Sequence, residues 1–206
     1  MDPSLAILEF DSIAHGIVAG DAMAKRSPLD VLRAGTVHPG RYLVLAGGGT
    51  AEVEEAVEAG RIAGSAGLIG VVFLPDVHPD VVAALGGARR AGGDALGVIE
   101  TRTVTAVIEA ADAGVKNADV VLRELRIADD LGGKGYVLFG GTQTEVEAAV
   151  EYGVARIGDE ERPVTHVTIA RLHAEMDDNL RADGRFAPHV AGTTKDDTDP
   201  RPPKGA

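Results

Sequence analysis

AEVEEAVEAG at residues 51–60 returns as TEVEAAVEYG at residues 144–153. Seven of the ten positions are identical at an offset of 93 residues, which is far more agreement than unrelated stretches show. Repeated sequence predicts repeated structure, and a repeat has to be recognised before other structural assignments are made. In each copy Val, Ala and Gly recur every three or four positions, which predicts a helix with one buried face and an exposed face rich in glutamate.

The likeness extends over both halves of the chain. It continues upstream at an offset of 91 and downstream at an offset of 95, so small insertions separate blocks whose order is kept. The upstream identities pair Leu5 with Leu96, Glu9 with Glu100, Ile17 with Ile108, Ala19 with Ala110, Asp21 with Asp112, Ala22 with Ala113 and Lys25 with Lys116, and the downstream ones pair Val72 with Val167 and His78 with His173. The chain is therefore a tandem duplication of one domain of roughly 90 residues, a size that can hold its own core.

The composition sets the expected domain boundaries. We place the first domain at residues 1–88, a Gly-rich linker at 89–94 and the second domain at 95–185. Residues 186–206 contain few apolar side chains and several prolines, so we expect them to form a disordered tail. Hydrophobic residues make up 45% of the chain but aromatic residues only 3%, so the two cores must be built from small aliphatic side chains.

Charge and residue types exclude several classes of protein. A formal net charge of −12 would repel nucleic acids and anionic membrane surfaces. The chain has no Cys, which excludes disulfides, thiolate catalysis and cysteine-held metal clusters. No stretch approaches the roughly 20 apolar residues of a membrane span, and the start MDPSLAILEF lacks the basic region of a secretory signal. We therefore expect a cytoplasmic protein with no nucleic-acid partner and no membrane partner.

Each copy is predicted to fold as strand, helix, strand, strand, helix, strand. Strands are expected at 5–10, 29–34, 41–47 and 68–75 in the first copy and at 95–101, 120–127, 134–141 and 164–172 in the second. Asp11 or Ser12 can cap the first helix, and Thr101 or Thr103 its counterpart. This order is the ferredoxin-like, α+β arrangement, in which two helices cover one face of an antiparallel sheet. The other sheet face is left for a partner.

The second copy carries a family resemblance in ALGVIETRTVTAVIEAADAGVKNADVVL, followed by a Gly-bearing hairpin and GGTQTEVEAAVEYG. It resembles the shell domain of bacterial microcompartments (the BMC domain), in its G-x-I-E-T strand, its A-A-D-x-x-x-K-x-A helix and its second helix ending in Gly. Both copies keep the unpermuted order of elements, although the first departs with LEF and AGDAMAKRSP. The resemblance implies a structural shell protein in the microcompartment shell. Tandem members of this family form trimers in which six domains make a pseudohexameric plate.

The same resemblance implies a central pore for small metabolites, lined by the hairpin loops between the second and third strands. The spacing alone favours ordinary surface turns at these positions, and it is the resemblance that favours a pore. If they ring an axis, three copies of Asp129 and Asp130 would disfavour the passage of anions, and Arg41 and Lys134 could offset this. The expected pore residues are Thr36, Val37, His38, Pro39, Gly40, Asp129, Asp130, Leu131, Gly132 and Gly133.

The resemblance also assigns residues to the edge where plates meet. Lys25 and Lys116 match the family's edge lysine, although a cation at a helix C-terminus has a plain electrostatic explanation as well. The family's Pro-Arg-Pro-His edge motif is PDVH in the first copy and ARLH in the second. We expect Asp76, His78, Arg171 and His173 to lie at plate edges, with Asp76 and Arg171 giving the edges alternating charge. The implied partners are two further copies of this chain and other shell proteins.

Catalytic and cofactor motifs are weak. GGGT at 47–50 and GGTQT at 140–144 precede helices, but no P-loop lysine follows either of them. The six His residues show no zinc-binding spacing, and no nucleophile is paired with a base. We therefore expect no enzyme, no cofactor and no metal. The alternative function from the fold alone is a cytosolic, ferredoxin-like trimer with a ligand-binding or regulatory role.

Overall fold

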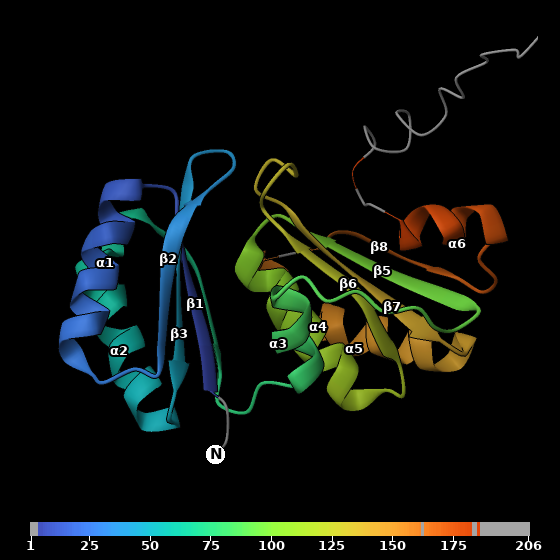
Figure 1. Cartoon of the computed structure of the whole chain (residues 1–206), viewed down its shortest axis with the longest axis horizontal. Helices are drawn as coiled ribbons and strands as arrows, with labels where there is room; N and C mark the ends of the chain where they lie inside the picture. Colours follow the sequence, from blue (N-terminus) through green and yellow to red (C-terminus); the bar gives the residue numbers. More distant parts are fainter. Residues whose placement is uncertain (1–3, 162, 183–184, 186–206) are drawn as a thin grey trace, which may run out of the picture. The chain divides into compact units, whose positions relative to one another are not determined.

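The computed structural model describes residues 4–161, 163–182 and 185. The first copy contains a four-stranded antiparallel sheet in the order β2-β3-β1-β4, with two helices on one face (Figure 1). Its elements are β1 Ser4–Phe10, α1 Ile13–Arg26, β2 Val31–Val37, β3 Arg41–Gly48, α2 Thr50–Ala63, the short 3₁₀ turn η1 Ser65–Gly67 and β4 Leu68–Leu74.

The second copy repeats this arrangement with the strand order β6-β7-β5-β8. Its elements are β5 Ala95–Thr101, α4 Val104–Asn117, β6 Val121–Ile127, β7 Gly135–Gly141, α5 Gln143–Glu161 and β8 Pro163–Ile169. The predicted duplication and the α+β, ferredoxin-like fold class are confirmed. Helix α5 is longer than the repeated ten residues indicated.

The local sequence explains where the elements begin and which face they bury. Ser12 caps α1 and Thr103 caps α4, each accepting a hydrogen bond from the backbone N–H three residues on, at 3.4 and 3.3 Å. The buried face of α2 consists of Val53, Ala56, Val57 and Gly60, as the repeat predicted. On β1 the residues Ala6, Leu8 and Phe10 alternate toward this helical layer and form the first core with it.

The two sheets share their register in detail. Ile7 lies opposite Leu45 on the neighbouring strand, and their counterparts Val98 and Leu138 also lie opposite each other. Both first strands carry an irregularity next to the matched glutamate, Glu9 or Glu100, where they pair with the last strand of the domain. Strand β6 alone has a further register shift, between Leu122 and Glu124. The shared register allows residues of the two domains to be compared position by position.

Two short helices were not predicted. Helix α3 (Pro79–Leu85) follows β4, and α6 (Ala174–Arg181) follows β8. His78 and His173, matched in the repeat, cap them through Nδ1, which accepts a backbone N–H at 3.2 and 3.3 Å. Residues from 172 onward form a unit separate from residues 4–171, so α6 is described by itself. The predicted tail at 186–206 lies outside the described residues.

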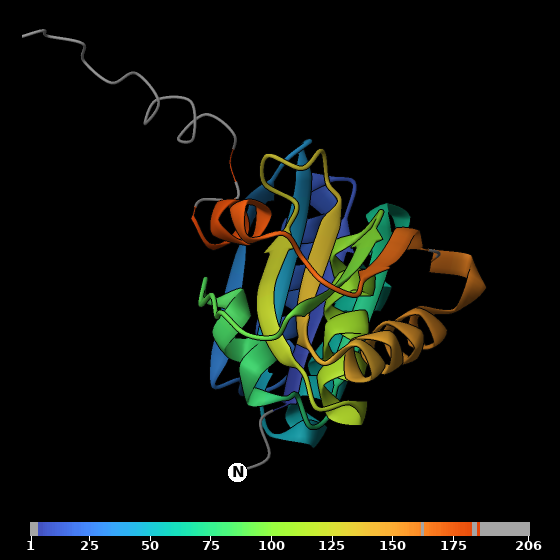
Figure 2. The same ribbon diagram turned by 90° about the vertical axis from the view of Figure 1, so that its right-hand side faces the viewer.

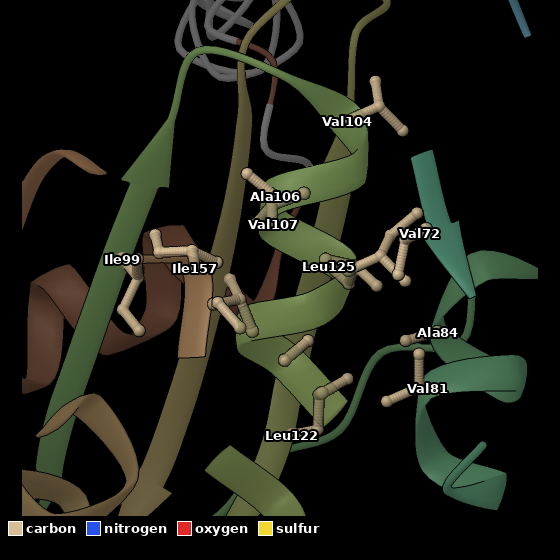
Figure 3. Close-up of a cluster of buried hydrophobic side chains, with 14 of the residues drawn as sticks. Val72, Val81, Ala84, Ile99, Val104, Ala106, Val107, Leu122, Leu125 and Ile157 are labelled. Carbon is tan, nitrogen blue, oxygen red and sulfur yellow. The ribbon is translucent and has the colours of Figure 1, made fainter. Parts of the chain in front are cut away.

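The second domain covers the sheet face that the helices of the first domain leave open. Leu5, Ile7 and Val72 on this outer face belong to one hydrophobic cluster with the buried side of α4. Figure 3 shows Val72 of β4 and the α3 residues on one side of α4, and Ile99 of the second sheet on its other side. The first partner of the open sheet face is thus the second half of the same chain.

Candidate functional site

The two hairpin loops expected to line a pore lie side by side. Loop 38–40 joins β2 to β3, and loop 128–134 joins β6 to β7; Figures 1 and 2 show the two tips adjacent from both directions. The backbone N–H of His38 donates to Asp129 Oδ1 at 3.0 Å, and His38 Nδ1 lies 3.4 Å from the same oxygen. A contact between the two domains therefore joins residues from both predicted loops.

Arg41 links these loops to each other and to the first sheet through hydrogen bonds. Its Nη1 donates to the backbone oxygens of Gly133 at 3.0 Å and Arg102 at 3.2 Å, and to Glu9 Oε1 at 2.6 Å. Gly133 has φ +84°, and a Cβ at this residue would lie 2.9 Å from both Arg41 Cζ and Pro39 Cδ. The approach of the two loops therefore requires glycine at position 133.

Glu9 is the buried anchor of this network. Its side chain is 0% exposed, and its Oε2 accepts the backbone N–H groups of Val104 at 2.7 Å and Thr105 at 3.3 Å. These amides belong to the N-terminus of α4, where a carboxylate is favoured by the unpaired N–H groups and the helix dipole. Burial raises the pKa of Glu9, against the opposing effect of Arg41 and the two amide hydrogen bonds. One carboxylate thus joins the first sheet, the second domain's helix and the loop pair.

The other expected pore residues are placed as follows. Thr36 and Val37 are the last residues of β2, paired with Tyr42 and Arg41, so they precede the turn rather than forming it. Gly40, Asp130 and Gly132 adopt positive φ angles of 95°, 64° and 64°. Leu131 lies in the same turn, where its N–H donates to the backbone oxygen of Ala128. Positive φ at several neighbouring residues gives loop 128–134 its tight, folded shape.

One group of the expected edge residues meets at the junction of the two domains. Lys116 donates to the backbone oxygen of Asp76 and to Asp112 Oδ2 at 2.7 Å. Asp112, nearly buried, also accepts the backbone N–H of His78 at 2.8 Å. The structure therefore brings Asp76, His78 and Lys116 together through Asp112, a residue for which the sequence predicted no role.

The counterparts of this group in the repeat are solvent-exposed. Lys25 lies 2.5 Å from Asp21 on α1, and both side chains are more than half exposed. Arg171 and His173 are exposed as well. Glu100 and Lys134, which match Glu9 and Arg41, form an ion pair of 2.7 Å that is only partly buried. These two ion pairs are thus more exposed than the matched pairs at the domain junction.

Glu9 and Asp112 hold the loop pair and the domain junction, and neither was predicted from the sequence as a site residue. Their identity with Glu100 and Asp21 was visible in the repeat, and an acidic residue present in both copies of an apolar strand or helix was the available signal. Among the described residues, no group of three or more His, Asp or Glu side chains is arranged to hold a metal ion.

Comparison with known proteins places this arrangement in a family. The model of the BMC domain matches twice, at residues 4–77 and 95–172. The chain belongs to the BMC-domain family. It is a tandem-domain shell protein of bacterial microcompartments, a structural component of the shell rather than an enzyme, which confirms the resemblance seen in the sequence.

Relatives of this BMC-domain chain include both tandem and single-domain proteins. It is 34% identical over 177 residues to the bacterial microcompartment shell protein PduT of Citrobacter freundii, covering 85% of this chain and 96% of that one. It is 42% identical over 93 residues to the major carboxysome shell protein CsoS1A of Halothiobacillus neapolitanus, covering 43% of this chain and 89% of that one.

A solved structure supports the tandem assignment. The crystal structure of a microcompartment protein from Desulfitobacterium hafniense DCB has a TM-score of 0.74 and 36% sequence identity, and covers 86% of this chain and 99% of that chain. Within the described part of this BMC-domain chain, no helix combines the length and apolar character needed to cross a bilayer.

Proposed function

We propose that three copies of this chain close into a ring of six BMC domains, a pseudohexameric shell plate with a pore for small metabolites on its axis. The plate would join other shell proteins at its edges, in a cytoplasmic microcompartment. One observation carries the proposal: the two surfaces that meet at the junction between the domains each have an exposed counterpart in the same chain. These counterparts are a face of α1 in the first domain and the outer face of the sheet in the second domain. A second copy can fill each of them by repeating the same contact.

The apolar half of the junction shows this clearly. Val104 and Ile108 on α4 are completely buried, and α4 lies against β4 and β1 of the first domain. Their counterparts on α1 are Ile13 and Ile17, which are 40% and 54% exposed. A helix face of this kind left in water favours association with an apolar surface.

The matching surface is the outer face of the second sheet. Val72 on β4 is buried under α4, whereas its counterpart Val167 on β8 is 47% exposed, and Ile169 beside it is 38% exposed. The face of α1 on one copy and the face of β8 on the next would reproduce the contact between α4 and β4. Such a head-to-tail interface closes into a ring when the rotation per domain divides a full turn.

The polar half of the junction repeats in the same way. Glu9, held by Arg41, accepts two N–H groups at the start of α4. Glu100, held by Lys134, would accept those of Ile13 and Ala14 at the start of α1 in the next copy. Asp21 on the α1 helix of that next copy would take the place of Asp112 and receive the backbone N–H of His173. Polar groups fixed in this way determine the register of the interface.

In such a ring the loop pairs of the three copies would meet on the axis. Arg41 is bound to Glu9 and to two backbone oxygens, and Lys134 is bound to Glu100. Neither cation would therefore neutralise the carboxylates of Asp129 and Asp130 at the mouth of the pore, called here the lip. Three copies of Asp129 and Asp130 would then give the lip a negative potential that disfavours anions. The lining residues are Thr36, Val37, His38, Pro39, Gly40, Asp129, Asp130, Leu131, Gly132 and Gly133.

The plate edge would lie where the junctions between neighbouring domains reach the rim of the plate. Asp76 gives the edge of the first domain an acidic side chain, and Arg171 gives the second domain a basic one at the matched position. Lys25, Lys116, His78 and His173 flank these two positions. We propose that unlike edges pair preferentially, which would select both the neighbour and its orientation.

Electron microscopy and native mass measurement of the purified chain test the function together. We expect a mass of three chains, and sheets or tubes of plates at high concentration. Asp76→Arg should reduce or reorganise the sheets while leaving the trimer intact, with the exposed Glu54→Arg as a charge-matched control. A monodisperse trimer that never tiles and binds a nucleotide would favour the ligand-binding alternative, and a monomer would overturn the proposal.

A further inference from the structure

We infer that the segment after α6 of one copy fills an apolar groove on the first domain of the next copy, and so acts as a strap between subunits. This inference rests on the proposed trimer but concerns residues beyond the second family match, which ends at residue 172. The groove lies between the outer face of the first sheet and helix α3, and has a volume of about 450 Å³. Its apolar lining comes from Leu5, Val31, Leu45, Val77, Val82 and Leu85.

The corresponding position in the second domain is already filled by the chain itself. The backbone of Gly92 lies directly over Gly140, where a Cβ would be 2.1 Å from the Gly92 oxygen. The N–H of Arg90 donates to the backbone oxygen of Arg123 on β6 at 3.0 Å. Gly47, the counterpart of Gly140, has no such cover from the residues that the structure describes, and it lines the groove instead. The open groove is therefore the place where the first domain lacks a linker.

The strands beneath the linker and α3 in the second domain are more buried than their counterparts in the first domain. Leu138 and Leu96 are 4% and 2% exposed, and β6 is largely buried. In the first domain Leu45 is only partly buried and Val31 is 39% exposed. A segment lying in the groove would bring these residues to the burial of their counterparts, which is a favourable transfer of apolar surface from water.

The repeat identifies the segment. In the structure the linker spans residues 86–94, between the end of α3 and the start of β5, and so begins three residues before the predicted 89–94. Helices α3 and α6 match through His78 and His173 at an offset of 95, so the counterpart of the linker begins after α6, near residue 182. In a closed ring, the domain that follows the second domain is the first domain of the next copy. The 25 residues from 182 to 206 exceed the nine of the linker, so they can span the same path.

The residue types of the segment suit the groove. At the offset of 95, Phe186 replaces Ala91, next to the residue that covers Gly140 in the second domain. An aromatic ring fills an apolar space that the Gly-rich linker would leave open. On the strand the charge is reversed: Arg89 pairs with Glu124 at 3.1 Å, whereas Arg33 holds the register position of Glu124 in the first domain. The position of Arg89 corresponds to Gly184, which has the acidic Asp183 on one side and the basic Arg185 on the other.

Cysteine crosslinking between differently tagged copies tests the strap, because the full chain has no Cys of its own. Val31→Cys on one tagged chain and Phe186→Cys on the other are coexpressed, and the trimer fraction is oxidised gently. We expect a covalent dimer carrying both tags. The matched control replaces Val31→Cys with Ile62→Cys, an exposed position on α2 that should give no such dimer above background.

The possible results test the strap and the trimer independently. A trimer of normal mass without the mixed dimer overturns the strap and leaves the proposed function standing, whether the groove is empty or holds another molecule. A chain that never forms trimers overturns both. As a second measurement, Phe186→Ala should raise the dissociation constant of the trimer about tenfold or more, and an unchanged constant would contradict the strap.

Discussion

Helices α1 and α4 descend from one duplicated helix but lie in different surroundings. Both are capped by a hydroxyl, both place a Lys in the last turn, and both carry an Asp at the matched position. Yet the apolar face of α4 is buried inside the chain, whereas the same face of α1 lies in water. The difference shows that one copy of the chain buries only one of two matching apolar helix faces, and in the proposed trimer a second copy covers the other.

The largest expected difference comes from placing a charge on each helix. Ile108→Asp puts a carboxylate without a partner into the core, at a cost of several kcal/mol, so we expect unfolded or insoluble protein. Ile17→Asp should leave the fold within about 0.5 kcal/mol of the wild type and abolish the trimer. Circular dichroism and light scattering measure the two effects.

Ile62→Asp is the control for this pair. Ile62 is 68% exposed on α2, outside the expected interface, so its substitution should change neither the fold nor the mass. A trimer that survives Ile17→Asp would show that the exposed face of α1 has another role.

The two matched ion pairs, Arg41 with Glu9 and Lys134 with Glu100, should differ in how much they stabilise the chain. Arg41→Met leaves Glu9 buried without its cation and should destabilise the chain by about 3–5 kcal/mol. Lys134→Met breaks a partly exposed pair and should cost about 0–1 kcal/mol in a monomeric Ile17→Asp background. In the trimer, where Glu100 would be buried against the next copy, the cost of Lys134→Met should increase. Urea unfolding of the wild type, Lys134→Met, Ile17→Asp and the double variant measures the cost of Lys134→Met in each background. Equal costs in the two backgrounds would contradict the proposed burial of Glu100.

The third comparison concerns the glycines of the two loops. Gly40 and Gly133 are counterparts with φ angles of 95° and 84°, so alanine at either costs about 1–2 kcal/mol of backbone strain. Only at Gly133 would the new methyl group also meet Arg41 and Pro39; at Gly40 nothing lies within 4 Å. Gly133→Ala should therefore be more destabilising than Gly40→Ala by about 1 kcal/mol or more. Thermal unfolding of both variants is the measurement, and equal effects would mean that the loops separate without cost.

The smallest expected effect is a pH dependence located at Glu9. Because its pKa is raised in the folded chain, folding takes up a proton between the ordinary pKa of 4.5 and the raised pKa. Its contribution to stability is therefore greatest at acidic pH and is lost as the pH rises through the raised value. The free energy of unfolding of the wild type minus that of Glu9→Gln should increase as the pH falls from 7 toward 4.5. A decrease over this range would mean that Arg41 outweighs burial.

The sequence predicted the duplicated fold because its signals are local. Alternating and helical periodicity, the caps at Ser12 and Thr103, and the repeated blocks each operate within a few residues or a simple offset. The short helices α3 and α6 were missed because one turn or two of helix gives too little periodicity. Their capping residues, His78 and His173, were visible only as a matched pair whose role was not evident.

The site was less predictable than the fold. The loop residues were located by counting from the repeat, but their contact across domains depends on how α4 lies against the first sheet, which no local pattern encodes. Glu9 illustrates this: its partners at Arg41 and Val104 are 32 and 95 residues away. Long-range polar networks of this kind need the packed structure before they can be recognised.

A cryo-electron microscopy map of the purified chain tests the central claim most directly. The account predicts a threefold plate of six domains, with loops 38–40 and 128–134 around its axis and Glu100 against the start of α1 in the next copy. A map in which the chain is monomeric, or in which these loops point toward the rim, would contradict it.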